Sequence, residues 1–212
     1  MRERWRRALG LGLSLVIAVV VSGPAWAGTP TEQLRSQIER VLKTLEDPEL
    51  RKDSKATERR SAVRKLAEGI FDFEETARRS LGRHWAARTP AEREEFVRLF
   101  ADLLERSYLT KMEIYGGEKI QYVGDAVDAG NATVKTKIVA KGGTEIPVDY
   151  KMLRKADRWL VYDVAIEGVS LVSNYRTQFN KIIQTSSYQE LVRKLKTKHE
   201  EFLEEQKRTS QR

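Results

Sequence analysis

The pattern of apolar and polar residues changes its period twice along the chain. Up to about Ile114 the apolar residues recur every three or four positions, which predicts amphipathic helices. From Glu118 to Glu167 they alternate with polar residues, which predicts strands, and after Gly168 the helical spacing returns. This order predicts an α+β fold, in which helices pack against a single, mainly antiparallel, four-stranded sheet.

The helices before the sheet begin and end at recognisable signals. Residues 29–32, Thr-Pro-Thr-Glu, combine a cap, a proline in the first turn and a glutamate three residues after the cap. Residues 89–92, Thr-Pro-Ala-Glu, repeat this signal. Asp47 before Pro48 predicts the end of the first helix. Asp72 is a candidate cap, and Gly82 predicts a helix end.

The strands are expected to form an antiparallel meander, because short turns with glycine or aspartate separate the alternating runs. Pro147 lies in the third run and cannot donate a backbone hydrogen bond, so we expect a bulge or an edge position there. The alternation places one apolar row on the face that the helices cover: Tyr122, Val134, Ile138, Ile146, Val148, Tyr150, Leu160, Tyr162, Val164 and Ile166.

The stretch from Trp159 to Ile183 joins a strand directly to a helix. In the strand, Val161, Asp163 and Ala165 alternate with the apolar row and are expected to face outward. After Gly168, Ser170 is a candidate cap. The following helix carries an apolar stripe: Leu171, Val172, Tyr175, Phe179, Ile182 and Ile183.

The first residues are typical of a secretory signal peptide. Four arginines precede an apolar run over 9–21 and an Ala-Trp-Ala cleavage site. The run is shorter than the roughly 20 residues that a spanning helix needs. We therefore expect cleavage after Ala27, which divides the chain into a signal peptide (1–27), one α+β domain (28–203) and a charged C-terminal tail (204–212).

Composition narrows the range of functions. The chain has 39 basic and 31 acidic residues and a net charge of +8. Without the signal peptide 35 basic and 30 acidic residues remain, which leaves +5. This modest excess suits contact with anionic lipid surfaces or ordinary solubility. Export and the absence of a recognised motif argue against nucleic acid as a partner. The sequence has no cysteine, which excludes thiol catalysis and cysteine-based metal sites.

Candidate catalytic groups are few. His84 and His199 lie far apart in the sequence, and neither belongs to a known catalytic or metal-binding motif. Asp149, Asp163 and Glu167 share the outward rows of neighbouring strands, where lysines on the same rows favour cross-strand charge pairs over acid–base work. We expect no catalytic residue, no metal site and no cofactor.

The strand–helix stretch resembles the signature of the MlaC family, also called the toluene-tolerance family, through the pattern YDVxIEGVSLVxNYRxQF from Tyr162 to Phe179. The segments 81–85, 89–90 and 95–100, together with Tyr108, are similar to the middle of the family sequence. The resemblance covers roughly residues 31–198. It implies a periplasmic phospholipid-binding protein with a twisted sheet wrapped by helices, related to the nuclear-transport-factor-2-like (NTF2-like) shape.

The resemblance also implies a deep apolar cavity that takes the acyl chains of a phospholipid. It implies a monomer that shuttles lipid between the outer membrane, with its lipoprotein–porin complex, and an inner-membrane ABC transporter complex. Arg176 is a candidate contact for the lipid phosphate. The residues expected to contact lipid are Phe100, Leu104, Tyr108, Tyr122, Val134, Ile138, Val148, Tyr150, Leu160, Tyr162, Val164, Ile166, Val172, Tyr175 and Phe179.

Two other functions remain open at this point. A carrier for hopanoids or other polycyclic lipids would share the signature and differ in the shape of its cavity. A small-molecule enzyme on the same fold would need a cluster of polar groups inside the cavity. The inward rows hold tyrosine hydroxyl groups but no carboxylate or histidine, which disfavours the enzyme.

Overall fold

The computed structural model describes residues 28–113 and 116–210, apart from the side chains of residues 53, 109–113 and 205–210. The predicted signal peptide lies outside the described residues. In chain order the elements are α1 (Pro30–Glu46), η1 (Asp53–Lys55), α2 (Ala56–Ile70), α3 (Phe73–Leu81), η2 (Gly82–His84), α4 (Pro90–Glu113), β1 (Lys119–Asp128), β2 (Asn131–Val139), β3 (Glu145–Lys155), β4 (Arg158–Ile166), β5 (Val169–Ser170), α5 (Leu171–Thr185) and α6 (Tyr188–Ser210). The predicted α+β class is confirmed.

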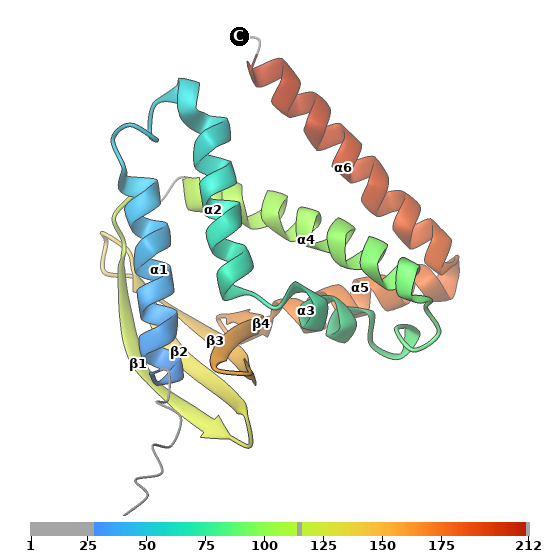
Figure 1. Ribbon diagram of the computed structural model, residues 1–212, viewed down its shortest axis with the longest axis horizontal. Helices are drawn as coiled ribbons and strands as arrows, with labels where there is room; N and C mark the ends of the chain where they lie inside the picture. Colours follow the sequence, from blue (N-terminus) through green and yellow to red (C-terminus); the bar gives the residue numbers. More distant parts are fainter. Residues whose placement is uncertain (1–27, 114–115, 211–212) are drawn as a thin grey trace, which may run out of the picture.

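The molecule has two halves (Figure 1). The α1–α2 pair and the sheet form one half, α4, α5 and α6 form the other, and α3 lies between them. α1 is fixed to the sheet by polar contacts at both edges of the region it covers. The Thr31 hydroxyl donates to Asp125 of β1 at 2.7 Å, and Gln33 accepts a hydrogen bond from the backbone N–H of Trp159 in β4 at 2.9 Å.

The predicted helix signals are confirmed. Thr29 and Glu32 form a capping box at α1. The Asp72 carboxylate accepts from the Glu75 backbone N–H at the start of α3, and Gly82 ends that helix with φ of +56°. Ser170 caps α5. α6 continues to Ser210, past residue 204, where the sequence predicts the start of a tail.

The sheet has the predicted antiparallel meander order, with a fifth strand that the sequence did not predict. This strand, β5, has two residues, and Val169 pairs with Ile166 of β4. On one side Pro147 pairs with Lys137 of β2. On the other side the pairing of β3 with β4 begins only at the next residue, Val148. Its carbonyl accepts from Glu167 in the turn after β4. Pro147 is therefore at a local edge on the β4 side, one of the two predicted solutions.

The two faces of β4 differ from the prediction. The row expected to face outward is buried, with exposed fractions of 0% for Val161, 5% for Asp163 and 8% for Ala165. The row expected to face inward is only half-buried: Leu160, Tyr162, Val164 and Ile166. α2 packs against β4, and so do α3 and α5. Both faces of β4 are therefore covered, and the prediction of a single buried face is wrong for this strand.

A β-bulge explains part of this difference. Lys151 of β3 pairs with Asp163, but the next residue, Met152, pairs with Val161. Tyr162 is therefore an extra residue in β4, and the side chains before it change face. Val161 joins Met152 on the face under α1 and α2, where alternation alone would have placed Tyr162. A similar shift interrupts β1 between Tyr122 and Gly124.

The buried apolar residues form two separate clusters. We call the first the sheet cluster, because it joins α1 and α2 to the sheet: Leu34, Val41, Leu45, Val63, Ile70, Ala132, Val134, Met152, Trp159 and Val161. We call the second the helix cluster, because it lies among α3 to α6: Ala77, Leu81, Phe96, Leu99, Phe100, Phe179, Tyr188, Leu191, Val192 and Leu195. Within the described residues, no helix combines the length and apolar character needed to cross a membrane.

Candidate functional site

A small cavity lies where the two halves meet. Its volume is about 30 Å³, which is room for one or two water molecules. Its walls come from α3, α4, β4, α5 and the α2–α3 connection: Phe71, Thr76, Phe100, Leu104, Tyr162, Asp163, Val164, Leu171, Val172 and Tyr175. The side chains on its surface are mostly apolar, so the cavity is suited to a hydrocarbon group but must widen to hold a long one.

The residues expected to contact lipid are distributed unevenly around this cavity. Those in its wall are Phe100, Leu104, Tyr162, Val164, Val172 and Tyr175. Those outside its wall are Tyr108, Tyr122, Val134, Ile138, Val148, Tyr150, Leu160, Ile166 and Phe179. In that second group Val134 lies inside the sheet cluster, with Tyr122 and Tyr150 packed against it, and Phe179 lies inside the helix cluster.

Four wall residues were not predicted as contacts: Phe71, Thr76, Asp163 and Leu171. Phe71 belongs to the connection between α2 and α3 and forms a parallel bridge with Val161 of β4. The Thr76 hydroxyl lies next to the Tyr162 carbonyl at 3.0 Å. Because these contacts join segments about ninety positions apart, periodicity could not show them. Leu171 is on the predicted stripe of α5, which was the available signal for it.

Asp163 places a carboxylate in the wall, which corrects the expectation that the inward residues include none. It accepts hydrogen bonds from the Ser170 hydroxyl at 2.6 Å and from the Val172 backbone N–H at 3.1 Å. Lys151 Nζ lies 3.2 Å from Asp163 Oδ2, the oxygen that also accepts from Ser170. Asp163 therefore fixes the start of α5 to β4, and its bonds are already used in that structural role.

Tyrosine hydroxyl groups supply polarity outside the cavity wall, and one of them, that of Tyr108, interacts with Tyr175 of the wall. Burial and a hydrogen bond with Tyr175 raise the pKa of Tyr108 to about 12. Burial raises the pKa of Tyr122 to about 12 and raises that of Tyr150 as well. These hydroxyl groups stay protonated at neutral pH, so they can donate a hydrogen bond without adding charge to the interior.

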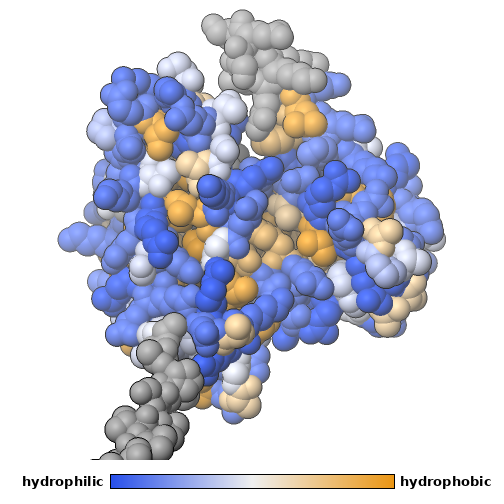
Figure 2. Space-filling model, in the orientation of Figure 1, coloured by the Kyte–Doolittle hydropathy of each residue, from blue (hydrophilic) through white to orange (hydrophobic). Residues whose placement is uncertain are grey.

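Partly exposed apolar side chains border the clusters on the outside. Leu66 of α2 packs at the edge of the sheet cluster, and Leu103 and Leu104 of α4 pack at the edge of the helix cluster. Figure 2 shows a band of apolar atoms at the surface between the α1–α2 pair and the α4–α6 half. Apolar side chains therefore reach the surface along part of the boundary between the halves.

A second hollow, of about 830 Å³, lies between α1 and α2. Its wall includes Glu32, Arg40, Lys65 and Arg158 together with the amides of Gln33 and Gln37. Charged groups in the wall would lose hydration against hydrocarbon, at a cost of several kcal/mol for each ion. This larger hollow is therefore poorly suited to an acyl chain, in contrast to the small cavity.

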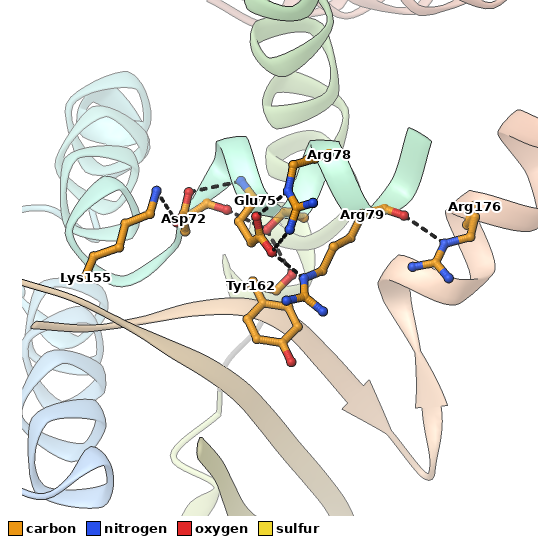
Figure 3. Close-up of polar contacts among 8 residues, drawn as sticks. Asp72, Glu75, Arg78, Arg79, Lys155, Tyr162 and Arg176 are labelled. Atoms are coloured by element: carbon orange, nitrogen blue, oxygen red, sulfur yellow. Dashed lines mark hydrogen bonds and ion pairs between the residues drawn. The ribbon is translucent and has the colours of Figure 1, made fainter. Parts of the chain in front are cut away.

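Three arginines come from α3 and α5, helices that also contribute to the cavity wall: Arg78, Arg79 and Arg176 (Figure 3). The Arg79 guanidinium lies over the Tyr162 ring, 4.0 Å from its centre. Glu75 accepts hydrogen bonds from Arg78 and Arg79, and the bond from Arg78 is the main cause that lowers the pKa of Glu75. Arg176 donates from Nε to the Arg79 carbonyl at 2.8 Å.

Known proteins share this sequence pattern and fold. The family model described as MlaC protein matches residues 35–197. A Haemophilus influenzae protein named intermembrane phospholipid transport system binding protein MlaC is 23% identical over 141 residues, which span 64% of this chain and 66% of that protein, slightly under two thirds of its length. A solved structure of a Ralstonia solanacearum phospholipid-binding protein in complex with a phospholipid has a TM-score of 0.72 and 24% identity, and the match covers 82% of this chain and 98% of that one.

Proposed function

Because the chain belongs to the MlaC family, we propose that it is a carrier that encloses the acyl chains of a phospholipid between its two halves. The observation that carries this proposal is the apolar cavity at the boundary of the sheet cluster and the helix cluster. The name of the Haemophilus relative and the phospholipid in the Ralstonia structure support the choice of ligand.

The cavity must widen for this function. At about 30 Å³ it cannot hold an acyl chain, so the ligand has to separate the side chains that meet across the boundary. Tyr162 and Val164 of β4 lie on one side, and Phe100 of α4 lies on the other. Burying hydrocarbon gains about 0.8 kcal/mol for each CH₂ group. A chain of ordinary length therefore gains on the order of 10 kcal/mol, which can offset the separation of these contacts.

The carrier proposal includes the compartment in which the protein acts and the membranes between which it moves lipid. We propose that the predicted signal peptide directs the chain to the periplasm and is cleaved after Ala27. The mature protein would act as a monomer, receiving phospholipid at the outer membrane and exchanging it with an inner-membrane ABC transporter complex. The partner at the outer membrane would be a lipoprotein–porin complex. Because transfer of the acyl chains from the protein into water is unfavourable, the lipid leaves the protein slowly, and release requires contact with a partner.

The first test is the identity of the bound lipid. The full chain is expressed with its signal peptide in a Gram-negative host, purified from the periplasm without detergent and extracted with organic solvent. We expect mass spectrometry to find phospholipid at a fixed ratio to protein. In a host that makes both lipids, hopanoid without phospholipid would instead assign the protein to polycyclic lipids. An extract without lipid would contradict the carrier proposal.

The second test locates the lipid. Val164→Trp adds a large side chain to the cavity wall and should lower the amount of bound phospholipid severalfold. Val169→Trp is the matched control, because Val169 is 60% exposed and lies outside the wall. Circular dichroism checks that both variants are folded. Equal lipid loading in the two variants would show that acyl chains do not occupy this boundary.

A further inference from the structure

Two arginines lie close to one wall of the cavity. Arg79 of α3 lies over the ring of Tyr162, which belongs to that wall. Arg176 of α5 donates a hydrogen bond to the Arg79 carbonyl. A molecule with an apolar part in the cavity would therefore meet these cations if its polar part left the cavity beside α3.

The two guanidinium groups are held in place through their Nε atoms. Arg79 donates from Nε to Glu75 at 2.6 Å, and Arg176 donates from Nε to the Arg79 carbonyl at 2.8 Å. Among the described residues, no hydrogen bond is made by the terminal nitrogens of either group. Those nitrogens remain available as paired donors, the geometry that binds phosphate oxygens.

The stem of Arg176 packs beside the end of α3. Gly82 ends α3 with φ of +56°, and a Cβ atom at Gly82 would lie in ordinary contact, at 3.5 Å, with Cδ of Arg176. The Arg176 stem therefore runs past Gly82 to reach the Arg79 carbonyl. Figure 3 shows Arg79 and Arg176 on neighbouring elements, joined through the Arg79 carbonyl.

The segments that follow Arg79 and surround Arg176 have a net positive charge. α3 itself is neutral, with two arginines and two glutamates. The loop over residues 82–89 adds two arginines, and residues 171–185 add one arginine and one lysine, with no acidic residue in either segment. These two segments together have a net charge of +4, whereas the chain after residue 27 has +5 in all.

We propose that Arg79 and Arg176 bind the phosphate of the lipid whose acyl chains occupy the cavity, and thereby favour anionic headgroups. This inference rests on the proposed carrier function. All phospholipids present a phosphate, but a headgroup with its own ammonium group neutralises that charge internally. A glycerol headgroup does not, so the arginine pair should bind phosphatidylglycerol more tightly than phosphatidylcholine.

The test is a competition for loading. Delipidated protein is incubated with vesicles of equal phosphatidylglycerol and phosphatidylcholine that contain some diacylglycerol, all with the same acyl chains, and is then repurified. Mass spectrometry of the bound lipid should show about a five- to tenfold preference for phosphatidylglycerol, the effect of roughly one charge-assisted hydrogen bond. The double variant Arg79→Gln, Arg176→Gln should reduce this ratio to near one and leave diacylglycerol loading unchanged.

Two further variants separate geometry from charge. Arg79→Lys with Arg176→Lys keeps both charges and removes the paired donors, and its ratio should fall between those of the wild type and the glutamine variant. Lys43→Gln with Arg98→Gln removes the same charge at exposed positions of α1 and α4, and should keep the wild-type ratio. Thermal unfolding of each variant checks that the fold is retained.

Several results would overturn the inference. Equal loading of phosphatidylglycerol and phosphatidylcholine by the wild-type protein would contradict the proposed phosphate site but not the proposed carrier function. If the loading ratio falls as much in the Lys43→Gln, Arg98→Gln control as in the arginine double variant, the preference comes from the net charge of the protein. Flotation with phosphatidylglycerol vesicles measures membrane binding separately. If the arginine variants lose this binding but keep the loading ratio, the pair binds the membrane surface and not the enclosed lipid. Wild-type protein that loads no lipid would overturn both proposals.

Discussion

The sheet cluster and the helix cluster differ in what fills them. The members of the sheet cluster are aliphatic apart from Trp159, and its other aromatic residues, Phe71, Tyr122 and Tyr150, pack against it from outside. In the helix cluster Phe100 packs edge to face on Phe179 at 5.1 Å between ring centres, and on Tyr175 at 5.0 Å. Phe96 contacts Phe179 in the same way at 5.6 Å. Such ring pairs have preferred geometries, whereas aliphatic contacts have few.

This difference indicates which side of the boundary yields to a ligand. Moving one ring of the helix cluster disturbs several ring contacts at once, because Phe100 contacts Phe96, Tyr175 and Phe179. The sheet side meets the cavity through the half-buried Tyr162 and Val164 of β4. We therefore expect the helix cluster to stay fixed while the sheet half moves away from it.

The largest expected effect comes from removing the centre of one cluster. Phe96 is fully buried, and Phe96→Ala should lower the free energy of unfolding by about 3–5 kcal/mol. Leu34→Ala is the matched change in the sheet cluster and should cost about 2–5 kcal/mol. Hydrogen exchange should show loss of protection mainly in α4–α6 for the first variant. An equal loss in the sheet would mean that the two clusters form one cooperative core.

A smaller effect is expected at the joint between the halves. Asp163 of β4 is buried and bonds Ser170 and Val172 at the start of α5. Asp163→Asn keeps the shape and removes the charge, so it should lower the free energy of unfolding by about 1–3 kcal/mol in urea denaturation. Lys151→Gln, which changes the exposed partner of the ion pair, should cost less. Equal costs would show that the bonds to α5 do not depend on the charge.

An ion pair on the outside joins α2 to α4 across the boundary. Arg64 contacts Glu105 and lies 3.3 Å from Asp102. Because Arg64 is about half exposed, the coupling in a double-mutant cycle of Arg64→Gln and Glu105→Gln should be about 0.2–1 kcal/mol. Lipid exchange should become faster in either variant. Unchanged exchange would show that the halves separate elsewhere.

The smallest expected effect depends on pH. The hydrogen bond from Arg78 lowers the pKa of Glu75, and the contact with Arg79 acts in the same direction. The stabilisation by Glu75 is therefore complete above the usual pKa of a glutamate, and it is lost as the pH falls through the lower value of the folded state. Acid titration of the free energy of unfolding should show a shallower decline in Glu75→Gln. Glu74→Gln, the exposed neighbour, should follow the wild type.

Local signals predicted most of the fold. Thr29, Asp72 and Ser170 act as caps, as expected, because a cap depends only on residues within one turn. The strands and their order also follow from alternation and short turns. Alternation failed in β4 for two reasons. One extra residue, Tyr162, changes the face of the residues before it, and α3 and α5 bury the other face of the strand at Asp163 and Ala165. Nothing in the local sequence marks that residue as a bulge.

The site was less predictable than the fold. The stripe of α5 and the long helix α4 supplied Phe100, Leu104, Val172 and Tyr175. Phe71 and Thr76 enter the wall only because the α2–α3 connection crosses the edge of β4, a contact between distant segments. Sequence patterns likewise gave no measure of the cavity, since its volume depends on how closely the two clusters approach.

The irregularity in β1 affects how the protein behaves when it is concentrated. β1 is the outermost strand, and the shift between Tyr122 and Gly124 interrupts its pairing with β2. An uninterrupted outer strand presents a straight ladder onto which a second molecule can add, and repeated addition produces fibrils. The kink at Gly124, with φ of +148°, bends that ladder partway along its length. Replacing this kink with regular strand would remove a local barrier to aggregation.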